Sequence, residues 1–160
     1  MGIGLRKSKC RISIETAFAG RAAFDRRRLK DAAEFFAAKS AARSSLAFRE
    51  VVVVLQDDAG SDEAHRAIMD VGGATDVITQ RYDAMPGEES GVYGELYVNV
   101  ERAAVAAPSR RNWNAEKELL LYVAHGMDHL AGEDDLDDAG YRRMRRRELK
   151  WLREFLEVHG

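Results

Sequence analysis

The sequence predicts an α/β (α+β) fold in which helices cover a small mixed sheet of about four strands. Segments with the alternating or β-branched pattern of strands are interleaved with longer segments whose apolar residues recur at helical spacing. No repeat and no low-complexity linker interrupts the 160 residues, and the length fits one hydrophobic core. We therefore expect a single domain over residues 1–160.

Four segments are expected to form strands. Residues 49–57, REVVVVLQD, form a β-branched run typical of a central strand that is covered on both faces. Residues 11–16, RISIET, alternate isoleucine with polar residues, as a half-buried strand does. Residues 75–82 form a third candidate, and residues 95–100, ELYVNV, form a fourth whose apolar face includes Val100.

Four helices are expected between and after these strands. The first covers about residues 21–40, and Ser61 is the expected N-cap of the second. Asn114 is the expected N-cap of the third, whose early glutamates favour the positive end of the helix dipole. The last covers about residues 137–157. The apolar stripe expected for the first helix comprises Phe24, Ala32, Phe35, Phe36 and the stem of Lys39.

Composition excludes several classes of protein. The 25 basic and 27 acidic residues leave a net charge of -2, so any affinity for RNA must be local. A single cysteine, Cys10, excludes an internal disulfide framework. The chain starts without the apolar region of a signal peptide and contains no apolar run of membrane-spanning length. We expect a soluble, cytoplasmic protein with no membrane partner.

A metal site is indicated by residues 123–135, VAHGMDHLAGEDD. His125 and His129 lie four residues apart, so a helix would place both imidazoles on one face. Gly132 can adopt the left-handed conformation that ends a helix and reverses the chain. Asp135 could then return to the imidazoles, and this triad could bind one Zn²⁺ with water in the fourth position.

Other metal chemistries share part of this pattern. The spacing resembles that of metzincin peptidases, but their general-base glutamate directly follows the first histidine, where this chain has Gly126. Asp128, three residues after the first histidine, lies to one side of it on the helix and cannot replace that glutamate. The facial triad of non-haem iron oxygenases is a further alternative that the predicted architecture disfavours. A glycine within a helix costs about 1 kcal/mol against alanine, so Gly126 suggests that another backbone passes close to it.

The segment HGMDHLAGEDD resembles the signature HGxLHLxGYDH of the YbeY family, metal-dependent endoribonucleases of ribosomal RNA maturation. Three positions depart from the signature: Asp128 replaces its Leu, Glu133 its Tyr, and Asp135 its third His. ATDVITQ (74–80) and GELYVNV (94–100) also resemble family segments, PTDVLSF and GDIxIS. The positions that match the signature are His125, Gly126, His129, Leu130, Gly132 and Asp134.

The resemblance implies a single-strand-specific endoribonuclease that acts in ribosomal RNA maturation and ribosome quality control, with one zinc ion per chain. Its partners would be single-stranded or ribosomal RNA and ribosomal subunit proteins, and no DNA is expected. The alternatives are a catalytically weak, metal-stabilised ribosome-binding factor and a metallohydrolase with another substrate. The implied metal ligands are His125, His129 and Asp135.

The resemblance also implies where RNA would bind. The cleft beside the metal would be lined by Thr75, Asp76, Gly94 and Glu95. An arginine of the family falls near Met69, and the nearest basic residue is Arg66. We therefore expect substrate contacts from Arg66, Thr75 and Asp76, with Arg110 and Arg111 as further candidates for phosphate binding.

Overall fold

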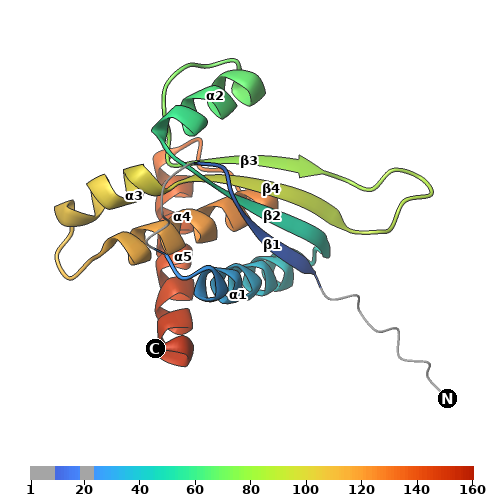
Figure 1. Cartoon of the computed structure of the whole chain (residues 1–160). Coiled ribbons are helices and arrows are strands. Elements are labelled where there is room, and N and C mark those ends of the chain that lie inside the picture. Colours follow the sequence, from blue (N-terminus) through green and yellow to red (C-terminus); the bar gives the residue numbers. More distant parts are fainter. Residues whose placement is uncertain (1–9, 19–23) are drawn as a thin grey trace.

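The computed structural model describes residues 10–18 and 24–160, and it shows a four-stranded sheet with helices packed against it (Figure 1). This confirms the predicted fold class. The strands are β1 (Arg11–Thr16), β2 (Phe48–Gln56), β3 (Val77–Tyr82) and β4 (Val92–Asn99). The helices are α1 (Arg26–Ser44), α2 (Asp58–Met69), α3 (Val100–Ala106), the 3-10 turn η1 (Ala107–Ser109), α4 (Ala115–Leu130) and α5 (Asp138–His159).

The strand order is β1-β2-β4-β3, with β2 parallel to both of its neighbours and β3 antiparallel to β4. The run of β2 from Val51 to Gln56 is buried without interruption, which confirms it as a central strand covered on both faces. In β4 buried and half-buried residues alternate up to Tyr97. Alternation is expected where one face packs on helices and the other is more open.

Helix α4 lies at the centre of the packing. It contacts β3 and β4 on one side and α1 and α5 on another (Figure 1). Every residue from Glu118 to Ala124 is buried, so most of the helix is surrounded by protein. Among the described residues, no helix combines the length and the apolar character needed to span a bilayer. The helix that carries both histidines is therefore a rigid central element.

Two helix starts differ from the expectation. Ser61 is not an N-cap, because α2 begins three residues earlier and the Asp57 side chain accepts a hydrogen bond from the Gly60 amide at 2.8 Å. The Ser61 hydroxyl instead accepts from the Thr75 amide at 3.0 Å. Helix α1 begins after Asp25, which accepts from the Arg27 and Arg28 amides, and it extends to Ser44; the expected start at 21 lies outside the described residues.

The end of β4 also differs from the expectation. Val100 is the first residue of α3 and not the last residue of a strand. The Asn99 side chain caps α3 by accepting a hydrogen bond from the Arg102 amide at 3.1 Å. Asn114 caps α4 as predicted, by accepting from the Lys117 amide at 2.8 Å. The last helix is confirmed as α5, close to its predicted bounds.

Gly126 allows α4 to approach the sheet. A Cβ atom at this position would lie 2.7 Å from Cδ2 of Leu96 and 3.3 Å from Cγ2 of Val77. The neighbours are therefore side chains of β4 and β3, and the expectation of a nearby backbone was wrong. Leu96 is fully buried, so its methyl groups have little room to move away.

Gly126→Ala should lower the free energy of unfolding by about 1–2 kcal/mol, because overpacking costs more than alanine regains in helix propensity. Urea denaturation measures the change. In a Leu96→Val background, which removes the clashing methyl groups, the same substitution should cost much less. An equal cost in both backgrounds would show that contact with Leu96 is not the reason for the glycine.

Candidate metal centre

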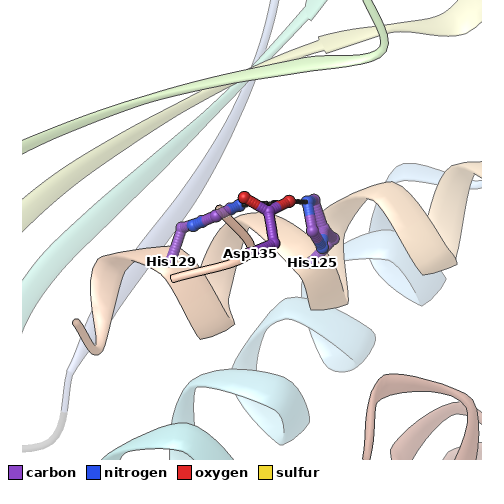
Figure 2. A group of neighbouring side chains, drawn as sticks. All are labelled: His125, His129 and Asp135. Carbon is purple, nitrogen blue, oxygen red and sulfur yellow. Dashed lines mark hydrogen bonds and ion pairs between the residues drawn. The ribbon is translucent and has the colours of Figure 1, made fainter. Parts of the chain in front are cut away.

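His125 and His129 rise from successive turns of α4, and Asp135 returns toward them from the loop that follows the helix (Figure 2). Gly132 has a φ of 96°, the positive value that the chain reversal was expected to require. The two Nε2 atoms are 3.0 Å apart, and Oδ2 of Asp135 lies 3.5 Å from each of them. The structure thus brings together the three residues expected to bind metal.

Hydrogen bonds determine which ring nitrogens carry protons. Nδ1 of His129 lies 2.9 Å from the carbonyl oxygen of Glu133, which can only accept, so this Nδ1 is the donor. Nδ1 of His125 likewise donates to the carboxylate of Glu148, with a distance of 3.1 Å to Oε2. In the neutral rings, both Nε2 atoms therefore present a lone pair.

This arrangement fits a metal ion. When both rings are neutral, two nitrogen lone pairs and a carboxylate oxygen converge, an arrangement that a bound cation stabilises. Metal–ligand bonds of 2.0–2.2 Å in a tetrahedral zinc site separate neighbouring ligand atoms by roughly 3.3 Å, close to the observed spacing. Nitrogen and oxygen donors of this kind suit zinc and also other divalent transition metals.

Glu148 is a supporting residue that the sequence analysis missed. It is fully buried in α5, with Met144, Trp151 and Leu152 on the same helix face. Burial acts to lower the pKa of His125, but the hydrogen bond and the charge of Glu148 outweigh it, so the pKa is raised. Such a carboxylate fixes the ring orientation and increases the basicity of the ligand. A charged residue on the apolar face of an amphipathic helix was the signal that could have found it.

The two other departures from the family signature belong to an ion-pair network. The fully buried Asp128 accepts two pairs of hydrogen bonds from Arg147, with its shortest contact 3.0 Å from Nη2. Glu133 lies 3.3 Å from Nη2 of the same arginine and also pairs with Arg43. Burial raises the pKa of Asp128 to about 6, although Arg147 acts to lower it. Because the carboxylate of Asp128 is buried and bound to Arg147 of α5, it is no candidate for a general base.

The expected substrate-binding residues lie in different places. Arg66 is on α2, where Nε lies 3.1 Å from Asp62, and its side chain is largely exposed. Thr75 and Asp76 precede β3, and Oδ1 of Asp76 accepts from the Val77 amide at 2.7 Å. The charge of Asp76 acts to raise the pKa of His125, so this carboxylate lies within electrostatic reach of the metal centre.

The remaining expected residues are farther from the centre or face away from it. Gly94 packs against Leu130 of α4, whereas Glu95 lies on the opposite face of β4, so it does not line the metal side. Arg110 stacks over Trp113 near the start of α4. From that start to His125 the helix rises about 15 Å. Arg110, and Arg111 beside it, therefore lie toward the other end of α4.

The fold and the three converging side chains define a small α/β protein with a candidate metal centre on its central helix. The family model described as "Endoribonuclease YbeY" matches residues 17–156, and the chain belongs to the YbeY family. The YbeY endoribonuclease of Micrococcus luteus is 38% identical over 95 residues, which cover 56% of this chain and 60% of the relative. That of Salinibacter ruber is 31% identical over 109 residues, covering 65% and 69%.

A solved structure supports the same assignment. The solution structure of a Thermotoga maritima protein aligns with a TM-score of 0.59 and 27% sequence identity. The alignment covers 93% of this chain and 90% of the other. The similarity therefore extends over nearly the whole fold.

We expect about one transition-metal ion per chain in protein purified without chelator, and the melting temperature should rise with added zinc because only the folded state presents the site. Asp135→Ala and His129→Ala should weaken zinc binding to a similar degree. Isothermal titration and elemental analysis measure both effects.

Asp134 and Asp138 provide carboxylate controls from the same loop and the following turn. Asp137 caps α5, and Asp134 accepts a hydrogen bond from the Leu136 amide at 2.6 Å. Asp138 is exposed in the first turn of α5. Asp138→Ala should leave zinc affinity unchanged, and Asp134→Ala should reduce it less than Asp135→Ala. A larger effect at Asp134 would transfer the third ligand to that residue.

Arg147→Leu should lower the free energy of unfolding at pH 7 by about 3–5 kcal/mol, because it leaves Asp128 charged, buried and without its cation. The double variant Asp128→Leu/Arg147→Leu should be about as stable as the wild type. Burial raises the pKa of Asp128 to about 6 in the wild type, and loss of Arg147 should raise it further, so the penalty in Arg147→Leu should already shrink as the pH falls toward 6. Urea denaturation at several pH values measures this, and a double variant as unstable as Arg147→Leu would contradict it.

Proposed function

We propose that this protein is a metal-dependent, single-strand-specific endoribonuclease that acts in ribosomal RNA maturation and ribosome quality control. The observation that carries the proposal is the convergence of His125, His129 and Asp135, in a chain of the YbeY family. The M. luteus and S. ruber relatives are named as endoribonucleases, and the aligned region spans 60% of the first of them. We further propose one zinc ion per chain and a cytoplasmic location.

In RNA cleavage, the residues of the centre would bind the metal ion or hold its ligands in position. When bound, a divalent metal ion polarises a phosphoryl oxygen and lowers the pKa of a water molecule. His125 and His129 supply neutral nitrogen donors, and Glu148 and the Glu133 carbonyl hold the two rings in place. The ring orientations are therefore set before any RNA binds, which is the preorganisation that electrostatic catalysis requires.

Substrate contacts would come from the segment before β3. Thr75 and Asp76 present a hydroxyl and a carboxylate near the centre, and both groups can hydrogen-bond to ribose hydroxyls. Arg66 is exposed on α2 and could contact a phosphate farther along the strand. Single-stranded RNA is favoured because its backbone can bend toward the recessed ligands, whose side chains are only 12–30% exposed. Ribosomal RNA and ribosomal subunit proteins are the proposed partners, and DNA is not expected to be a substrate.

The peptidase alternative has little support in the geometry. The position of its general base is Gly126, which packs directly against Leu96. Asp128, the nearest carboxylate on the same helix, is fully buried and bound to Arg147. A peptidase would thus have no group to accept a proton from the attacking water at the usual place.

The zinc-loaded protein should cleave an unstructured oligoribonucleotide at internal positions, and chelator or His125→Ala should abolish cleavage. Raised salt should suppress it, because backbone contacts are electrostatic. Gel electrophoresis of end-labelled RNA, with zinc, manganese and magnesium compared, measures the activity. A DNA strand of the same sequence and a casein substrate should remain intact.

Asp138→Ala is the matched control, since it removes a carboxylate that is close in sequence to Asp135 but is not an expected metal ligand. It should cleave as the wild type does. If the metal-loaded protein leaves RNA intact with every ion but still binds ribosomal subunits, it is a binding factor and not a nuclease. Cleavage that persists in His125→Ala would point to a contaminating nuclease.

A further inference from the structure

Arg145 is a cation on α5 that the mechanism above does not use. It lies on α5, three residues before Glu148, whose carboxylate accepts from His125. Side chains three apart share a helix face, so Arg145 and Glu148 lie on the same side of α5. The loop that carries Asp135 leads directly into this end of α5. Arg145 therefore lies on the first half of α5, after the loop that carries Asp135 and on the helix face that carries Glu148.

The guanidinium of Arg145 is held in place but is largely without partners. Its Nη2 donates to the Tyr141 hydroxyl at 3.1 Å, and its Cζ lies 5.4 Å from the centroid of the Tyr141 ring. Its Nε is shielded from solvent and has no acceptor in the part of the chain that the structure describes. No carboxylate of residues 10–18 or 24–160 forms an ion pair with it. Of the five N–H donors of a guanidinium, one donates to an acceptor among the described residues.

The neighbouring arginines differ from Arg145. Arg142, Arg143 and Arg146 are exposed, whereas Arg145 is half-buried. Arg147 is already committed to Asp128 and Glu133. Burial and the charge of Arg145 both act to lower the pKa of His125, although the hydrogen bond and charge of Glu148 leave it raised. The guanidinium is therefore within electrostatic reach of a site that itself takes a cation.

Two cations side by side repel each other unless an anion lies between them. A phosphodiester can satisfy both, because its two non-bridging oxygens can contact different partners. We propose that Arg145, oriented by Tyr141, binds an RNA phosphate at the metal centre. It would supply the phosphate contact that the sequence analysis sought in Arg66, Arg110 and Arg111. This inference rests on the proposed function, because it assigns the RNA backbone as the ligand.

The test compares Arg145→Gln, Arg145→Lys and the exposed control Arg146→Gln in the zinc-loaded full chain. Fluorescence anisotropy measures the binding of a labelled, unstructured 2′-O-methyl oligoribonucleotide, whose integrity is checked on a gel afterwards. Arg145→Gln should weaken binding by roughly tenfold, as expected for a charge-assisted hydrogen bond. The slope of log affinity against log salt should fall by about 0.7, the value for one lost phosphate contact on a single strand.

The other variants separate a phosphate contact from a structural role. Arg145→Lys should retain the salt slope, and Tyr141→Phe should weaken binding without changing the slope, because it removes only the hydroxyl that orients the guanidinium. All variants should retain zinc at the wild-type level. The inference is overturned if Arg145→Gln shows the same slope as Arg146→Gln, if it loses zinc, or if the wild type does not bind RNA.

Cleavage of unmodified RNA is scored separately by the wild-type protein. Binding with an Arg145-dependent slope but without cleavage would reject the nuclease proposal and retain the phosphate site. Cleavage by the wild type, with a salt slope that does not depend on Arg145, would retain the nuclease proposal and reject the phosphate site.

Discussion

The buried hydrogen bond between Glu148 and His125 is the interaction on which the organisation of the site depends. A fully buried carboxylate is costly unless it is paired, and here its partner is a ring of the central helix. The bond joins α5 to α4, sets the His125 tautomer and directs its Nε2 toward the other ligands. The orientation of His125 therefore depends on the packing of α5 against α4.

The electrostatics around this bond differ from what the family signature suggests. Where the signature has Leu and Tyr, this chain has Asp128 and Glu133, and the structure provides Arg147 and Arg43 as their partners. The two positions therefore form ion pairs with α5 and α1 that the uncharged residues of the signature could not form. Because buried ion pairs contribute little net stability, the replacement can be nearly neutral as long as both partners are present.

The third ligand has a related consequence. A carboxylate in place of an imidazole reduces the net positive charge of a metal-loaded centre, so its Lewis acidity is weaker and harder metals compete better with zinc. In the proposed nuclease, a guanidinium would restore positive charge where the phosphate binds. Arg145 is the residue proposed for this role, because it has no ion-pair partner among the described residues and its Nη2 is oriented by Tyr141.

Local sequence signals predicted those features that depend on a few neighbouring residues. The β-branched run of β2, the Asn114 cap, the glycine that reverses the chain at 132 and the spacing of His125 and His129 were all read correctly. Errors arose where two local signals competed. Both Asp57 and Ser61 can cap a helix, and only the contact of Ser61 with Thr75, 14 residues away, decides between them.

The sequence by itself determined the four strands, the four longer helices and the convergence of His125, His129 and Asp135, because these follow from periodicity and from the chemistry of adjacent residues. It did not reveal the short helix α3. Tertiary structure alone decided which residues distant in sequence contact the side chains of α4. Glu148 is 23 residues from His125, and Arg147 is 19 residues from Asp128. Their partners are set by how α5 packs on α4, and no local pattern encodes that packing. The same holds for Gly126, whose role depends on Leu96 and Val77 in two other strands.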